Sequence, residues 1–292
     1  MSKETIGFVG TGVMGGPMAL HLLNAGYSVC VYNRTKAKAE AILEAGGTWM
    51  ESPGELAAAC DIICTMVGYP TDVESTYFGD DGLINRAKTG ALFIDFTTSR
   101  PDLAVRIAEA AEKAGKASLD APVSGGDKGA REAKLSIMVG GSESAYQRAR
   151  PVLEIVGANI VYQGPAGSGQ HTKMCNQIAV AASTMGACEA LRYAEQSGLD
   201  PATVLQSISA GAAGSWSLSN LAPRILKGDF EPGFYVHHFI KDLKIAIESA
   251  ESMAIELPGL QLALKLYEEL AAMGHEQDGT HALMHWYRSK DS

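Results

Sequence analysis

The sequence predicts an α/β protein in which a doubly wound, mostly parallel sheet is followed by an all-helical part. Two observations predict this fold class. Short, continuously apolar runs alternate with helical patterns over the first half, which is typical of strands buried on both faces. After Pro165 we find helical patterns and no strand pattern. We therefore expect two domains, at residues 1–164 and 165–292.

The elements of the first domain follow in regular order. The expected strands are "TIGFVG", "YSVCVYN", "DIICTMV", "GALFIDF", "KASLDAPV", "KLSIMVG" and "NIVYQG". Helices are expected between most of them, and the first two of these close on Gly26 and on the pair Gly46–Gly47, as helix C-termini commonly do.

The second domain opens with a stretch that lacks proline and is rich in Ala, Met and Leu, over residues 168–196. This composition predicts one long helix, on the order of 40 Å at the usual rise per residue. Shorter helices are expected near residues 201–210, 214–227, 238–255, 258–273 and 280–288.

The composition excludes several classes of function. The chain has 292 residues, 46% of them apolar and 20% charged, which is typical of a globular protein. Its net charge of −9 and the lack of a basic block argue against nucleic acids and anionic membranes as partners. No run approaches a membrane span, and no signal-peptide core precedes the first strand. Cys60 and Cys64 lack the spacing of a redox or zinc pair, so we expect reduced thiols and a cytoplasmic protein.

A glycine-rich turn follows the first expected strand. Gly10, Gly12 and Gly15 fit the pattern G-x-G-x-x-G, with Val13 and Met14 between the last two. In a dinucleotide site, the first glycine allows the tight turn, the second admits the pyrophosphate, and the third lets helix and strand pack closely. A plain tight turn is the alternative for such a motif alone. Its place between a strand and a helix favours the cofactor interpretation.

The end of the second strand indicates which dinucleotide binds. NAD sites usually carry an acid there for the ribose hydroxyls, but this chain has Asn33, Arg34 and Thr35, followed by Lys36 and Lys38. A guanidinium pairs well with a 2′-phosphate, so we expect NADP, with NAD as the alternative. A solvated turn in which Thr35 caps the second helix is also open, and both interpretations can hold together.

Three further stretches carry chemistry: "DAPVSGG" (120–126), "GSGQHTKMCN" (167–176) and "HHFIKDLKIA" (237–246). With "IGFVGTGVMGGPMA" they occur in an order that resembles the β-hydroxyacid dehydrogenase family. That family includes 3-hydroxyisobutyrate dehydrogenase, tartronate semialdehyde reductase and the glyoxylate/succinic semialdehyde reductases. The resemblance covers nearly the whole chain. It implies a Rossmann domain followed by an all-α domain, as in 6-phosphogluconate dehydrogenase.

The resemblance also implies a reaction: hydride transfer between a nicotinamide and the β-carbon of a short 3-hydroxy acid or semialdehyde. Lys173 matches the family's catalytic lysine, which gives or takes the proton, and Asn176 matches the residue that orients it. The family binds the substrate carboxylate with residues that match Ser124, Gly125 and Gly126. The expected cofactor contacts beyond the glycine turn are Lys241 from the helical domain and, on the nicotinamide side, Met66, Val67 and Thr98.

Three residues depart from the family's usual pattern. Arg100 is either a solvated helix start or a second anion binder, and the sequence does not rank the two. Tyr69 is expected near the cofactor if the likeness holds. Trp216 either shapes the substrate pocket or belongs to the core.

A metal site and two other functions are the alternatives to this interpretation. His281 and His285 share a helix face, but no acid or cysteine stands at a supporting spacing, so we expect no metal. An imine reductase on the same fold is an alternative, although such relatives typically replace the lysine that this chain keeps as Lys173. The other alternative is an NADP-binding sensor without turnover. A homodimer or homotetramer is expected, partly from the apolar character of the long helix.

Overall fold

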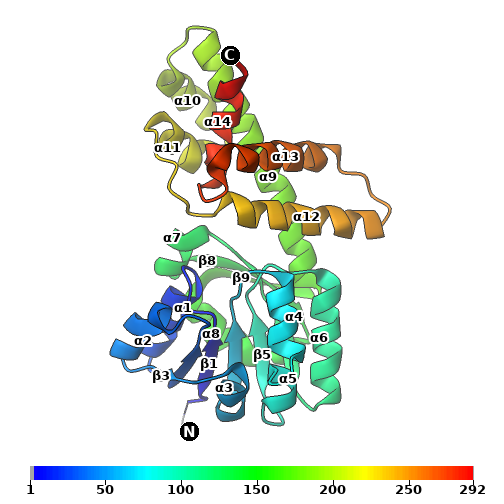
Figure 1. The fold of residues 1–292 in the computed structure, drawn as a ribbon. Helices are drawn as coiled ribbons and strands as arrows, with labels where there is room; N and C mark the ends of the chain where they lie inside the picture. Colours follow the sequence, from blue (N-terminus) through cyan, green and yellow to red (C-terminus); the bar gives the residue numbers. More distant parts are fainter. Residues whose placement is uncertain (1–2, 292) are drawn as a thin grey trace. The chain divides into compact units, whose positions relative to one another are not determined.

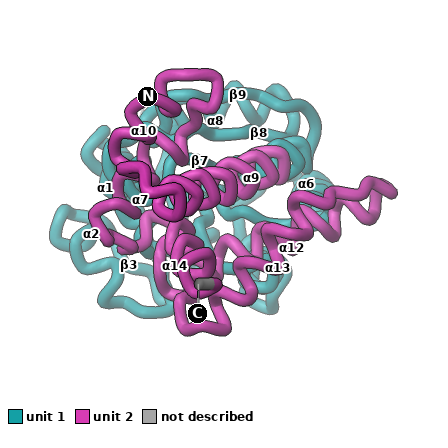
Figure 2. The backbone as a smooth tube through the Cα atoms, turned by 90° about the horizontal axis from the view of Figure 1, so that it is seen from above, with its two compact units in different colours: residues 1–173 teal, residues 174–292 magenta. Residues whose placement is uncertain are grey.

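A computed structural model describes residues 3–291. The chain forms two compact units, Met1–Lys173 and Met174–Ser292, which Figure 2 colours separately. The first unit is an α/β fold and the second is helical (Figure 1).

The first unit is built on one twisted sheet of nine strands. Its order is β3-β2-β1-β4-β5-β6-β8-β7, and β9 pairs with β8. Neighbours from β3 to β6 are parallel, whereas β8 runs antiparallel to β6 and β7. The strands are β1 (Ile6–Val9), β2 (Val29–Tyr32), β3 (Thr48–Trp49), β4 (Ile62–Thr65), β5 (Leu92–Asp95), β6 (Ala117–Asp120), β7 (Val123–Ser124), β8 (Leu135–Gly141) and β9 (Gly157–Gly164).

Helices cover both faces of this sheet. Successive strand residues alternate between two cores: Ile62 and Cys64 of β4 pack on one side and Ile63 packs on the other. The first face carries α1 (Gly15–Asn24), α2 (Glu40–Glu44), α7 (Gly126–Arg131) and α8 (Glu143–Val156); the second carries α3 (Pro53–Ala59), α4 (Pro70–Phe78), α5 (Leu83–Arg86) and α6 (Pro101–Lys113). The expected doubly wound α/β fold is therefore confirmed.

Some local details differ from the sequence-based expectation. The run "KASLDAPV" is not one strand, because Pro122 has no N–H to donate and separates β6 from β7. The second helix is shorter than expected, since a 3-10 turn over Lys36–Ala39 precedes α2. Two-residue strands such as β3 are too short to give a period-2 pattern.

The second unit is helical, and its long helix is as expected. Helix α9 spans Ser168–Gln196, and its first six residues belong to the first unit. The other helices are α10 (Pro201–Ser209), α11 (Ala222–Leu226), α12 (Val236–Ser252), α13 (Pro258–Leu270) and α14 (Leu283–Arg288), around a core that includes Phe239 and Tyr267. In the described part of the chain, no helix is both long and apolar enough to cross a membrane.

Candidate active site

The glycine-rich turn lies at the carboxyl end of β1, where the sheet's connections reverse direction between β1 and β4. Gly10 has a φ of +93°, and a side chain there would collide with the carbonyl oxygen of Met66. At Gly15 a Cβ would collide with the carbonyl oxygen of Gly10. Gly12 differs, because a Cβ there would meet no atom within 4 Å. The protein's own packing requires the first and third glycines and leaves open space at the second.

Polar groups at the same turn fit a phosphate. Thr11 is 3% exposed, and its Oγ1 is among the described buried atoms that have no hydrogen-bond partner. Helix α1 begins at Gly15 with no side-chain cap from Met14 and no acid in its first turn. An uncapped helix N-terminus favours a bound anion. Val13, next to Gly12, is 55% exposed. The residues present therefore fit a dinucleotide pyrophosphate.

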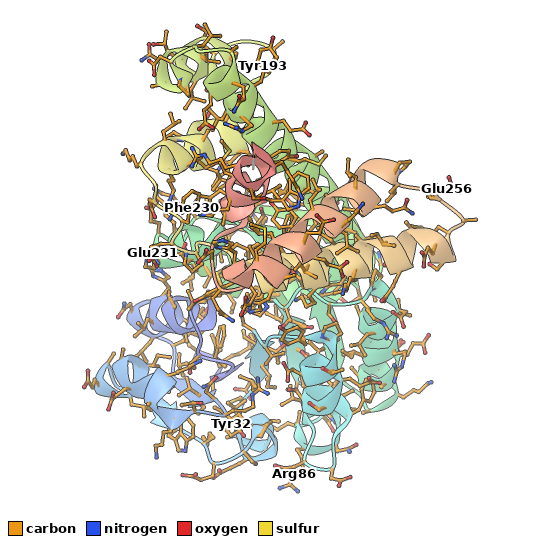
Figure 3. All side chains as sticks on the ribbon, turned by 45° about the horizontal axis from the view of Figure 1, so that its top comes forward. Tyr32, Arg86, Tyr193, Phe230, Glu231 and Glu256 are labelled. Carbon is orange, nitrogen blue, oxygen red and sulfur yellow. The ribbon has the colours of Figure 1, made fainter. Side chains whose placement is uncertain are left out.

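The end of β2 has two separate polar arrangements, just beyond Tyr32 (Figure 3). Asn33 Oδ1 accepts from the backbone N of Thr11 at 3.2 Å, and its Nδ2 donates to the Thr35 carbonyl at 2.9 Å. Asn33 therefore ties the glycine turn to β2. Arg34 is 78% exposed in its side chain and pairs with Asp72 at 3.1 Å. Thr35 stands at the N-cap position of the following 3-10 turn, as expected, but its side chain makes no capping hydrogen bond.

The ends of β4 and β5 lie beside each other and are joined by a buried network. Val67 N donates to Thr97 Oγ1 at 3.0 Å, and Thr97 N donates to Asp95 Oδ1 at 3.0 Å. Met66, Val67 and Thr98, the expected nicotinamide-side residues, are half-buried at these strand ends. The structure thus brings them to the carboxyl ends of the parallel strands, where the glycine turn also lies.

Lys173 lies in the first turns of α9, and its side chain reaches β7. Its side chain is buried, with 6% exposed, and Nζ donates to the carbonyl oxygen of Val123 at 2.8 Å. Ser124, Gly125 and Gly126 follow Val123 directly in the chain. Both glycines have φ in the left-handed region, at +132° and +62°, which other residues rarely adopt. The structure therefore brings the expected catalytic lysine to the expected carboxylate-binding turn.

Asp120 fixes the start of the helix that carries Lys173. Its two carboxylate oxygens accept from the backbone N of Gly167 and of Gln170, each at 2.8 Å. Asp120 is 4% exposed, and burial raises its pKa to about 6 although these hydrogen bonds act in the opposite direction. Asp120 is the first residue of the motif "DAPVSGG", but the sequence alone predicts no role for it.

Gln170 makes a second connection to the same helix turn. Its side chain is fully buried: Nε2 donates to the Thr97 carbonyl at 2.8 Å, and Oε1 accepts from Ser99 N at 2.9 Å. Gln170 precedes Lys173 by three residues, or almost one helical turn. The sequence gives no signal for these contacts, because Lys173 and Gln177, which follow on the same side of the helix, are also polar.

In the second unit a chain of amides and charges runs from Asn176. Its Nδ2 donates to Gln177 Oε1 at 2.6 Å, and Gln177 Nε2 donates to Asp242 Oδ2 at 2.6 Å. Lys241 Nζ is 3.2 Å from the other oxygen of Asp242, which is 1% exposed in its side chain. Two expected site residues, Asn176 and Lys241, are thereby connected through Gln177 and Asp242.

The three residues that depart from the family's usual pattern lie in different elements. Arg100 begins α6 and forms a double hydrogen bond with Asp102 of that helix. Tyr69 starts α4 and is 40% exposed. Trp216 is 63% exposed, so the alternative that it belongs to the core is wrong. His281 is buried, and its Nε2 is 2.7 Å from the Asp229 carbonyl.

Two family descriptions match the chain in succession. Residues 5–164 match the NAD binding domain of 6-phosphogluconate dehydrogenase. Residues 167–287 match the domain described as NAD-binding of NADP-dependent 3-hydroxyisobutyrate dehydrogenase. The chain belongs to the β-hydroxyacid dehydrogenase family. It is therefore an NAD(P)-dependent oxidoreductase of that family, with the 6-phosphogluconate dehydrogenase-like arrangement of domains that the sequence predicted.

Individual relatives agree along nearly the whole chain. The uncharacterized oxidoreductase YkwC of Bacillus subtilis is 59% identical over 281 residues, covering 96% of this chain and 98% of the relative. A probable mitochondrial 3-hydroxyisobutyrate dehydrogenase-like protein of Arabidopsis thaliana is 45% identical over 284 residues, covering 97% of this chain and 85% of the relative. Among solved structures, 3-hydroxyisobutyrate dehydrogenase of Mycobacterium tuberculosis, described with L-serine, has a TM-score of 0.90 at 33% identity. The match covers 98% of this chain and 99% of that structure's chain.

Proposed function

We propose that this protein is an NADP-dependent enzyme that interconverts a short 3-hydroxy acid and its semialdehyde, with Lys173 as the general acid and base. The observation that carries the proposal is the buried Lys173, whose Nζ donates to the carbonyl of Val123, directly before Ser124, Gly125 and Gly126. A buried cation beside a polar turn suits a small carboxylate whose reacting oxygen needs a proton. L-serine, named with the solved relative, is itself a 3-hydroxy acid.

The residues divide the chemistry as follows. NADP, when bound, supplies or takes up the hydride. During reduction Lys173 gives a proton from Nζ to the carbonyl oxygen, and during oxidation its neutral amine accepts the hydroxyl proton. Its positive charge also stabilises the negative charge that develops on that oxygen. Ser124, Gly125 and Gly126 hold the carboxylate, while Asn176 orients the reacting groups.

Turnover by Lys173 variants tests this proposal. NADPH consumption is followed with glyoxylate, succinic semialdehyde, tartronate semialdehyde and methylmalonate semialdehyde. Lys173→Ala is expected to lower kcat on the best substrate by about 100-fold or more, because the proton donor is lost. Lys173→Arg keeps the charge but does not release a proton near neutral pH, so it should also be inactive.

Binding of NADPH, measured by fluorescence, should stay unchanged in both Lys173 variants and serves as the control for folding. Turnover by Lys173→Arg close to that of the parent would contradict proton transfer by this residue. Tight NADPH binding without turnover on the whole panel would favour an imine substrate or a sensor.

The NADP preference rests on Arg34, which the proposal assigns to the 2′-phosphate. Arg34→Ala is expected to raise KM for NADPH by about tenfold, the effect of one lost charge-assisted hydrogen bond, with little effect on KM for NADH. Asp72→Ala removes the acid that pairs with Arg34 and should lower KM for NADPH. Arg150→Ala, at another exposed arginine that pairs with an acid, is the control. Equal changes for both cofactors would contradict the assignment.

The homodimer or homotetramer expected from the family and the cytoplasmic location also belong to this proposal. Light scattering on the full chain measures the oligomeric state.

A further inference from the structure

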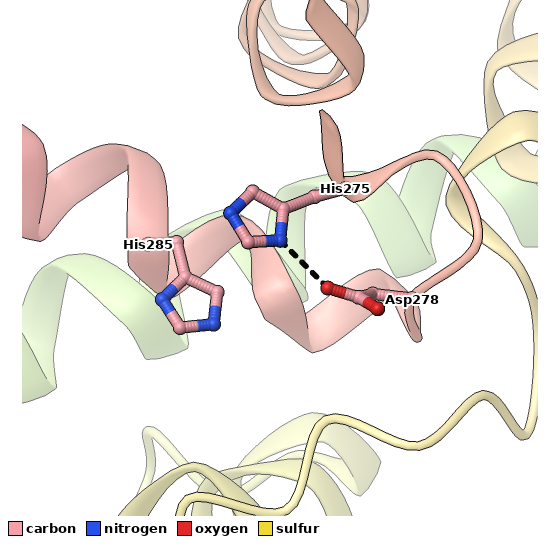
Figure 4. A group of neighbouring side chains, drawn as sticks. All are labelled: His275, Asp278 and His285. Carbon is pink, nitrogen blue, oxygen red and sulfur yellow. Dashed lines mark hydrogen bonds and ion pairs between the residues drawn. The ribbon is translucent and has the colours of Figure 1, made fainter. Parts of the chain in front are cut away.

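The second unit contains a cluster of possible metal ligands that the reaction does not use. His275, Asp278 and His285 each offer one ligand atom, and these atoms all lie within 4.8 Å of one another (Figure 4). His275 Nδ1 is 2.7 Å from Asp278 Oδ2, and the His275 and His285 rings are stacked with centroids 4.5 Å apart. All three side chains are half-buried, which leaves solvent access to the cluster.

The backbone that presents two of the ligands is held on several sides. Gly274, with φ of +94°, ends the helical path after α13 and turns the chain into the segment that carries His275 and Asp278. The Asp278 carbonyl accepts from Val236 N at 2.9 Å, and the Glu276 carbonyl accepts from His237 N at 3.1 Å. This segment is thus tied to the start of α12.

The third ligand comes from a different element. His285 lies on α14, and its ring packs on Phe230, labelled in Figure 3, with centroids 4.2 Å apart. Gly279 N donates to the Phe230 carbonyl at 2.9 Å, which joins the segment of Asp278 to the residue that supports His285. The nearest cation along α14, Arg288, pairs with Glu195 at 2.6 Å. The backbone positions of the three ligands are therefore set by the fold before any ion arrives.

We propose that His275, Asp278 and His285 bind one Zn²⁺ ion per chain, with water as the fourth ligand. Two imidazoles and a carboxylate suit a borderline ion such as Zn²⁺, whereas Mg²⁺ and Ca²⁺ prefer oxygen ligands alone. Tetrahedral zinc with bonds of about 2.0–2.2 Å spaces its ligand atoms by roughly 3.4 Å. The two imidazole rings, whose planes differ by 10°, must therefore turn out of their stacked arrangement when the ion binds. The ion joins the end of α13 to α14 and takes no part in hydride transfer.

Zinc titration of the full-length protein, freed of metal with a chelator, tests this site. Calorimetry should show one ion bound per chain, and Co²⁺ in its place should give the visible absorption of a tetrahedral site. His285→Gln and Asp278→Asn should each weaken binding by at least about tenfold. Zn²⁺ should raise the Tm of the parent and should not raise that of His285→Gln.

The control variant is His171→Gln. His171 and Cys175 are both exposed and lie four residues apart on α9, so they are the competing set for adventitious zinc. His171→Gln should leave binding at the proposed site unchanged, and circular dichroism of the metal-free variants should match the parent. Zinc binding that His171→Gln removes and His285→Gln keeps would overturn the proposal, as would no binding at millimolar Zn²⁺.

Discussion

At the scale of single residues, the three glycines of the G-x-G-x-x-G turn separate folding from binding. Gly10 is required by the close approach of the Met66 carbonyl and Gly15 by that of the Gly10 carbonyl, whereas Gly12 faces open space. The sequence motif does not distinguish these two reasons for glycine. Asn33 gives a similar lesson, because its side chain is occupied by Thr11 and Thr35 although the sequence suggested only a neutral residue for a phosphate.

This difference predicts opposite behaviour for two alanine variants. Gly12→Ala should keep the parent's stability, or gain up to about 1 kcal/mol from the less flexible unfolded chain, while weakening NADPH binding at least tenfold. Gly10→Ala should be strongly destabilised, because its Cβ would collide with the Met66 carbonyl at a positive φ. Thermal unfolding and NADPH fluorescence titration measure the two effects. Unchanged NADPH affinity in Gly12→Ala would show that the open space at Gly12 is not the pyrophosphate site.

At the scale of elements, the decisive feature is the first turn of α9, which Asp120 connects to β6. The pKa of Asp120 is raised from an ordinary 3.8 to about 6, and this determines how its contribution to stability changes with pH. The folded state holds the proton more tightly, so the group's stabilising contribution is complete below about pH 4 and is lost as pH rises through 6. For a shift of about two units, the contribution amounts to roughly 3 kcal/mol at most.

Asp120→Asn removes this titration. The free energy of unfolding of the parent minus that of Asp120→Asn is therefore expected to fall as pH is raised from about 4 to about 7. Urea unfolding measures this difference in buffers of matched ionic strength, followed by Trp49 fluorescence with both proteins carrying Trp216→Phe and Trp286→Phe. A constant difference across the range would mean that Asp120 titrates in the folded chain as it does when unfolded.

The same elements show how far the sequence could predict the structure. The helix over 168–196 and the central parallel strands were predictable, because long periodic or continuous apolar patterns are local signals. The contacts of Asp120 and Gln170 were not, since they join residues 47 to 73 positions apart with no repeating pattern. The sequence paired His285 with His281 by helical spacing, but the turn at Gly274 brings His275 to it instead.

At the scale of the whole molecule, the two units have separate hydrophobic cores. One unit holds the two cores on either face of the sheet, and the other holds the core among α9 to α14. The chain's three tryptophans report on them separately, because Trp49 lies in the first unit and Trp216 and Trp286 lie in the second.

We therefore expect two unfolding transitions that do not coincide. A Trp49→Phe variant reports the second unit, and a Trp216→Phe/Trp286→Phe double variant reports the first. NADPH at about 100 times its Kd should stabilise the unit that binds it by about 2.7 kcal/mol, since only the folded state binds. The proposed contacts to the cofactor lie mostly in the first unit, so the midpoint reported by Trp49 should rise more than the midpoint reported by Trp216 and Trp286. Coincident midpoints with and without NADPH would mean instead that the two units unfold as one cooperative body.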